Sequence, residues 1–186
     1  QPVAPLLPAR TSLLYASAGR LEFLQLDDNQ YLTDNPVVRQ GLSWAGLRWA
    51  FTTMAVSNWH PLTWLSHMLD VRLFGLDAGA HHLVNVLLHA SDAALLFLAL
   101  VRMTGAAGRS AAVAALFAVH PLHVESVAWV AERKDVLGTF FGFLMLLAYA
   151  WHAERPRPGR QALVAACLAA SLLSKPMWVT APFLLL

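Results

Sequence analysis

The sequence has little charge and almost no cysteine. Only 13% of its 186 residues are charged and 58% are hydrophobic, whereas ordinary soluble domains have about 25% and about 45 to 50%. Cys167 is the single cysteine, which excludes an internal disulfide and leaves the redox compartment open. A net charge of +2 gives no support for a nucleic-acid partner. This balance indicates one membrane domain of a few helices, with the lipid bilayer as its surroundings.

The beginning of the sequence also lacks a long apolar run. Arg20 and Glu22 interrupt the residues before Asp27, and no signal peptide is recognisable there. The sequence starts with Gln1 and stops within the apolar run "APFLLL". We therefore expect residues 1–186 to be a single membrane-domain fragment of a longer protein.

Residues 21–81 form a polar part of the chain, divided by turn signals at Asn35-Pro36, Gly41 and His60-Pro61. Tryptophans recur among the polar residues, as aromatic side chains do at a membrane surface. They are Trp44, Trp49, Trp59 and Trp64. We predict an extracytoplasmic loop bearing one or two short amphipathic helices. The alternative is a small soluble subdomain with a tryptophan-rich core.

Apolar runs follow and predict an all-α fold, a polytopic transmembrane helix bundle. The expected helices are 82–102, 110–121, 135–152, 161–174 and 176–186. The second and the fourth are short for a full crossing at about 1.5 Å per residue.

The arginines predict the orientation of these helices. They gather around 102–109 and 155–160, two crossings apart, so the positive-inside rule assigns both connections to the cytosol. The polar loop, the residues between His120 and Asp135, and Lys175 then share the opposite side. In a bacterial inner membrane this side faces the periplasm or exterior.

A dense group of ionisable residues interrupts the apolar part of the chain. It consists of His120, His123, Glu125, Glu132, Arg133, Lys134 and Asp135. Its cations violate the positive-inside rule, and they predict either a ligand site or a salt-bridged helix start. The histidines lack the spacing of a helical zinc motif, so no metal site is assigned, although a divalent cation stays open as a cofactor.

A second polar group has helical spacing. His82, Asn85, His89 and Asp92 are separated by three, four and three residues and share one helix face. In lipid this face must meet protein or a wet cavity. We expect Asn85 and Asp92 to form interhelical hydrogen bonds, whereas His89 suits this role or a ligand role. A transport or scaffold module would use the face as a solute path, but no internal repeat supports a carrier.

Several motifs occur in one order along the chain. They are "DDNQYLTDNP", "NWHPLTWLSHMLD", "FG" followed by "HHLVNVLLHA", "LFAVHPLHVESVAWVAERKDVL" and "LLSKPM". With them the sequence resembles, from Asp27 to its end, the membrane domain of bacterial relatives of the transmembrane and tetratricopeptide-repeat-containing O-mannosyltransferases. These are integral-membrane glycosyltransferases of the GT-C fold, and the chain would be the N-terminal part of such a domain. Family members have a helix before the acidic pair, and later helices and repeats, so an inactive fragment is the alternative.

The resemblance implies transfer of a mannose-like sugar from a polyprenyl-phosphate donor to a hydroxyl of an acceptor protein. The family's acidic pair matches Asp27 and Asp28, and one of the two would accept the hydroxyl proton. Cations would hold the departing phosphate, and histidines would donate hydrogen bonds to the phosphate or the sugar. The expected cations are Arg133, Lys134 and Lys175, and the histidines are His120 and His123.

Overall fold

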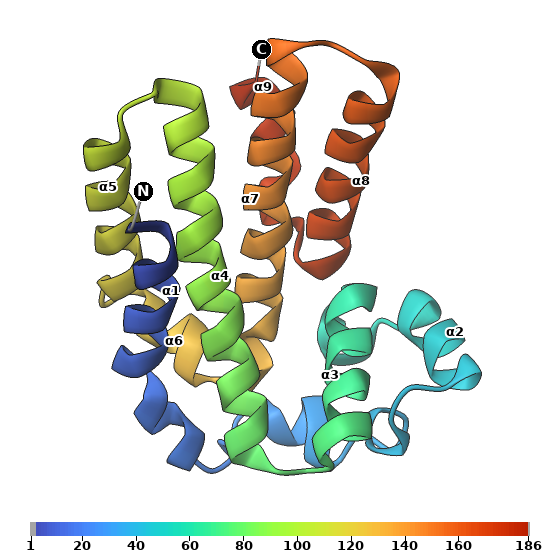
Figure 1. Cartoon of the computed structure of the whole chain (residues 1–186). Coiled ribbons are helices and arrows are strands. Elements are labelled where there is room, and N and C mark those ends of the chain that lie inside the picture. Colours follow the sequence, from blue (N-terminus) through green and yellow to red (C-terminus); the bar gives the residue numbers. More distant parts are fainter. Residues whose placement is uncertain (1–2, 186) are drawn as a thin grey trace.

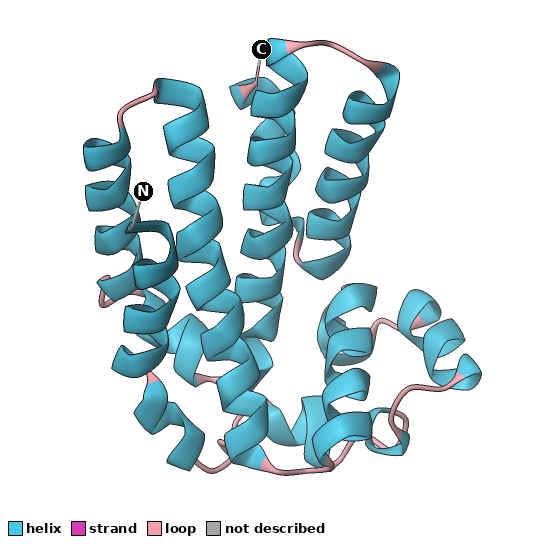
Figure 2. Ribbon diagram, in the orientation of Figure 1, coloured by secondary structure: helices cyan, strands magenta, loops and turns pink. Residues whose placement is uncertain are grey.

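The structure is a computed structural model that describes residues 3–185, and its helices pack side by side (Figure 1). No β-strand occurs in this part of the chain (Figure 2), so the expected all-α class is confirmed. The α-helices are α1 (Val3–Leu14), α2 (Trp44–Thr52), α3 (Pro61–Phe74), α4 (Ala78–Thr104), α5 (Ala107–Val119), α6 (His123–Ala128), α7 (Arg133–Glu154), α8 (Pro158–Ser174) and α9 (Ala181–Leu184).

Two stretches, Ala78–Thr104 and Val130–Glu154, are long and apolar enough to cross a membrane, judged by length and composition. Only 44% and 39% of their most apolar windows are buried. Leu83, Leu87 and Leu98 leave the α4 surface exposed and apolar. A core helix of a soluble protein would bury most of such a window, so these helices favour a membrane location.

Local sequence signals set the helix ends. The Asp77 carboxylate caps α4 by accepting a hydrogen bond from the Ala80 N–H at 2.8 Å. Gly105, with φ of 69°, ends α4 in a left-handed conformation that glycine adopts without strain. α5 ends at Val119, two residues before Pro121, and Pro158 opens α8 at its first turn.

The structure corrects the expectation for the last helix of the chain and adds a short helix before Asp27. A continuous helix over 176–186 is wrong: a 3-10 helix, Pro176–Thr180, follows Ser174 and leads into the short α9. Before Asp27, α1 forms a helix despite its lack of a long apolar run, and Leu7 packs with Phe97 of α4 and Ala114 of α5.

The long helices have two chemically different ends (Figure 1). One end carries the α4–α5 and α7–α8 connections, where Arg102 pairs with Glu154 at 2.7 Å and the Arg160 guanidinium lies 4.0 Å from the Trp151 ring centroid. We call it the arginine end. The opposite end, called the polar end, brings the residues before α2 together with α6 and the start of α7.

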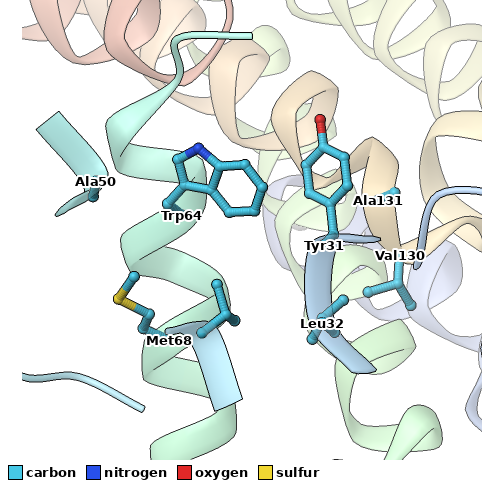
Figure 3. Packing of buried hydrophobic residues seen from close by; sticks show 8 residues of the cluster. Tyr31, Leu32, Ala50, Trp64, Met68, Val130 and Ala131 are labelled. Carbon is cyan, nitrogen blue, oxygen red and sulfur yellow. The ribbon is translucent and has the colours of Figure 1, made fainter. Parts of the chain in front are cut away.

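An aromatic core joins α3 to the polar end (Figure 3). Tyr31 and Trp64 are both fully buried and stack with ring centroids 4.7 Å apart. Val130 and Ala131 close the same cluster from the segment before α7. Trp64 is therefore a core residue and not the interfacial aromatic that its sequence context suggests, whereas Trp44 is 87% exposed.

Candidate functional site at the polar end

Arg133, the first residue of α7, is enclosed by protein. Its guanidinium is fully buried and lies 2.7 Å from Asp70 Oδ2 on α3. It also donates hydrogen bonds to Ser66 Oγ at 2.8 Å, to the His81 carbonyl at 3.0 Å and to Asn85 Oδ1. Such pairing offsets the cost of removing the charge from water. Arg133 is thus an internal cation held by protein groups, which disagrees with the phosphate-binding role that the resemblance implies for it.

The same buried region contains a group of metal-ligand type. Single ligand atoms of His67, Asp70 and His81 all lie within 4.8 Å of one another. Burial, reinforced by the nearby Arg133, lowers the pKa of His67 well below its ordinary value, so its imidazole is neutral. Because the guanidinium already neutralises Asp70, a divalent ion would add two further positive charges beside one carboxylate. We therefore assign Asp70 to Arg133 and not to a metal.

The acidic pair lies beside the start of α7, although 103 residues separate the two segments. Asp28 is fully buried; its Oδ1 accepts a hydrogen bond from the Ala131 N–H at 2.8 Å, and Oδ2 accepts one from the Leu24 N–H at 2.8 Å. Burial raises the pKa of Asp28, while these two donors and His82 oppose the shift. Asp28 thus holds the first acidic turn against the segment before α7.

Asp27 has a different environment from its neighbour. Its side chain is half-buried, and within residues 3–185 its carboxylate accepts no hydrogen bond. Burial raises the pKa of Tyr31, and the charges of Glu132 and Asp27 add to the shift, so both carboxylates lie near Tyr31. Of the acidic pair, only Asp27 keeps an oxygen available to an incoming hydroxyl group.

Four half-buried residues form what we call the charged cluster: Glu132, Lys134, Asp135 and Lys175. Glu132 pairs with Lys134 at 2.7 Å and with Lys175 at 3.6 Å, and Lys175 also pairs with Asp135. The Glu132–Lys134 pair agrees with the expected salt-bridged helix start, whereas a ligand role of this segment stays a prediction. Lys175 reaches the cluster from the end of α8. The cluster therefore joins two distant parts of the sequence.

Two aromatic residues that the sequence did not single out border the charged cluster. Lys134 Nζ lies 5.1 Å from the Tyr31 ring centroid, and the His60 ring stacks on Tyr31 at 5.5 Å. Burial lowers the pKa of His60 to about 4, and Lys134 and Lys175 add to the shift. The motifs "DDNQYL" and "NWHP" contain these residues, but only their contacts reveal that both lie at the site.

A cavity of about 410 Å³ opens beside the charged cluster, between α4, α5, α6 and α7. Lys175 and Asp135 lie at one side of it, and Ser126 donates a hydrogen bond to Asp135 Oδ2 at 3.0 Å. The remaining walls are His89, Asp92, Phe117, His123, Val136, Gly138, Thr139, Met177 and Trp178. A cavity of this size between helices, with both apolar and charged walls, falls in the range of small-molecule sites.

The four polar residues that share one face of α4 are all buried, so this face is turned toward protein. They are His82, Asn85, His89 and Asp92, called the polar stripe below. His82 contacts the Glu22 carbonyl at 3.3 Å, and Asn85 donates to the Trp129 carbonyl at 2.9 Å. His89 contacts the Ala118 carbonyl at 3.2 Å and also lines the cavity. The expected interhelical hydrogen bond of Asp92 is wrong, since neither carboxylate oxygen has a partner among the described residues.

The two predicted histidine donors differ in position. His123 lines the cavity, and burial lowers its pKa, with His120 adding to the shift and Asp135 opposing it. His120 is exposed, with its ring centroid 5.8 Å from that of His123. His123 therefore borders the cavity, whereas His120 does not line it.

The fold and the site together define a class: an all-helical protein with membrane-type helices and a charged cavity at one helix end. No family model matches the sequence, and no solved structure matches the fold.

Curated proteins give the particular relationship. The chain is 33% identical over 158 residues to the protein O-mannosyl-transferase TMTC1 of Mus musculus, covering 78% of this chain and 16% of that protein. It is 35% identical to Tmtc1 of Drosophila melanogaster over 67% of this chain and 14% of the relative. It is 39% identical to TMTC2 of Homo sapiens, over 52% of this chain and 12% of that relative. The chain is a relative of these protein O-mannosyl-transferases, and it spans less than a fifth of their length.

Proposed function

We propose that this chain forms the donor-binding part of a glycosyltransferase of the GT-C type. The enzyme would transfer a mannose-like sugar from a polyprenyl-phosphate donor to a hydroxyl of an acceptor protein. The observation that carries the proposal is that the charged cluster reaches one cavity through Asp135 and Lys175, while Asp28, the neighbour of Asp27, is hydrogen-bonded to the segment just before this cluster. The names of the relatives support the same reaction class.

In the proposed reaction the acceptor oxygen attacks the anomeric carbon of the donor sugar. The bond between this carbon and the phosphate oxygen breaks, and its electron pair stays on the departing phosphate. Lys175 and Lys134 balance the charge of this phosphate, with His123 as a hydrogen-bond donor, and Asp27 accepts the hydroxyl proton. Asp28 is a positioning residue, because it holds the turn that presents Asp27.

The same proposal assigns sides of the membrane. The arginine end would lie in the cytosol by the positive-inside rule, which leaves the cavity on the extracytoplasmic side. In a bacterial inner membrane that side is the periplasm. Cysteine labelling from outside the cell should then reach Asp27→Cys and not Arg157→Cys, and labelling of Arg157→Cys alone would invert the assignment.

Donor binding tests the proposal at Lys175. Radiolabelled polyprenyl-phosphate-mannose should bind the purified chain in lipid nanodiscs, and Lys175→Gln should weaken binding about tenfold or more, as expected for loss of a charge-assisted contact. The control Arg157→Gln removes the same charge at the exposed arginine end and should bind normally. Equal affinity of the wild type and Lys175→Gln would refute the proposed phosphate site.

Transfer to an acceptor tests the role of Asp27. In membranes containing the chain and the labelled donor, Asp27→Asn should abolish transfer of label to protein while donor binding is retained, because an amide does not accept the proton. Normal transfer by Asp27→Asn would contradict the assignment of the base. Absence of transfer by the wild type, with donor binding intact, would restrict the function of the chain to donor binding.

A further inference from the structure

Asp92 is a buried carboxylate without a partner. It lies in the middle of α4, is 1% exposed, and neither of its oxygens meets a hydrogen-bond donor among the described residues. An unpaired acid inside a membrane-type helix is costly, and such residues face a cavity when they occur. Here the cavity is the one beside the charged cluster, since Asp92 lines it together with Lys175.

The spacing along α4 gives the depth of Asp92. Asn85 bonds Arg133 at the start of α7, and Asp92 follows seven residues later, about 10 Å along the helix at about 1.5 Å per residue. Lys175 lies near the start of α7, where it pairs with Asp135. The cavity therefore has a cation near the polar end of the long helices and a free carboxylate further from that end.

Aromatic rings complete the walls between these two charges. Trp178 and Phe117 line the cavity, and both pack edge-on against Phe143 of α7 at centroid distances of 5.7 and 5.4 Å. Gly142 allows this position, because a Cβ atom there would lie 2.3 Å from the Trp178 ring. The Trp178 indole is thereby fixed as a rigid apolar surface beside the polar groups.

We propose that Asp92 binds the sugar of the donor, in a subsite formed with Trp178 and His89. This inference rests on the proposed function, because it takes Lys175 as the contact of the donor phosphate. A sugar ring presents several hydroxyl donors at its edge and an apolar face, which match the free carboxylate and the indole surface. The carboxylate accepts hydrogen bonds from two sugar hydroxyls, and the ring lies against Trp178.

Two lipids that differ only by the sugar test this assignment. Binding of polyprenyl-phosphate-mannose and of methyl polyprenyl phosphate, which keeps the singly charged phosphodiester and lacks the sugar, to the full chain in nanodiscs gives a sugar preference, the ratio of the two affinities. The wild type should prefer the mannosyl lipid, and Asp92→Asn should lose about tenfold of this preference, typical of a charge-assisted hydrogen bond. Lys175→Gln should weaken both lipids and leave the preference unchanged. Glu154→Gln, a carboxylate lost at the arginine end, is the matched control and should behave as the wild type.

The outcomes separate this inference from the proposed function. A wild-type preference retained by Asp92→Asn, or equal binding of both lipids by the wild type, overturns the sugar subsite and leaves the phosphate site intact. A parallel loss of both lipids in Asp92→Asn also overturns it, because the residue then supports the fold instead of binding the sugar. Failure of the wild type to bind either lipid overturns both proposals.

Discussion

Two groups of charged residues at the polar end use the same kinds of side chain in opposite ways. In the buried group, Arg133 meets Asp70 and Asn85, and its charge is satisfied by protein. In the cavity, Asp92 has no partner among the described residues, and Lys175 pairs with Glu132 and Asp135 but stays half-exposed. Both groups lie between α4 and α7. The difference teaches that satisfied charge holds these helices together, whereas unsatisfied charge beside a cavity marks the place for a ligand.

The strongest way to break this comparison is to remove Arg133. Arg133→Met should destabilise the protein by about 3 to 5 kcal/mol, because Asp70 is left as a buried charge without its partner. Thermal unfolding in detergent measures the effect, and the double variant Arg133→Met/Asp70→Leu should recover part of the loss. A stable Arg133→Met variant with weakened donor binding would instead make Arg133 a ligand residue.

The acidic pair repeats the comparison within two adjacent residues. Asp28→Ala should cost about 3 kcal/mol, since the N–H groups of Leu24 and Ala131 would both lose their acceptor, at about 1 to 3 kcal/mol each. Asp27→Ala should change the unfolding free energy by less than about 0.5 kcal/mol. Similar stability losses at both positions would mean that Asp27 is as structural as Asp28.

The pH dependence of stability tests the same comparison at His60. This histidine borders the charged cluster, yet its imidazole is kept neutral. Burial lowers its pKa from 6.5 to about 4, so the unfolded chain binds more protons than the folded chain between these pH values. The stability should therefore fall as pH drops from 7 to 5, by about 2 kcal/mol from this group. His60→Gln should lose that part of the pH dependence in thermal unfolding, whereas the exposed control His120→Gln should keep it. An unchanged pH profile in His60→Gln would show that His60 is not the group responsible.

The sequence predicted what depends on local pattern. The apolar runs indicated the all-α class, and the spacing of His82, Asn85, His89 and Asp92 indicated a shared face that is indeed buried. The separation of arginine-rich connections from the acidic turn also follows from counting helices along the chain. These features are encoded over a few helical turns, so they can be read without tertiary contacts.

The partners of each charge could not be read in the same way. Asp70 of α3 forms an ion pair with Arg133, more than 60 residues further along the chain. Lys175, at the end of α8, forms an ion pair with Asp135 of α7. Asp92 has the spacing of a hydrogen-bonded stripe, yet the helices opposite it leave a cavity. Whether a polar side chain is satisfied depends on which helices pack together, and that is a property of the fold and not of the local sequence.

The central claim is that the donor occupies the cavity at the polar end, and site-specific crosslinking tests it most directly. A photoreactive residue in place of Thr139 reports on this cavity, while one in place of Leu163 reports on an apolar crevice of about 340 Å³ near Arg102 at the arginine end. With radiolabelled polyprenyl-phosphate-mannose, the account predicts a crosslink from position 139 that excess unlabelled donor removes, and none from position 163. A crosslink from position 163 alone would contradict it.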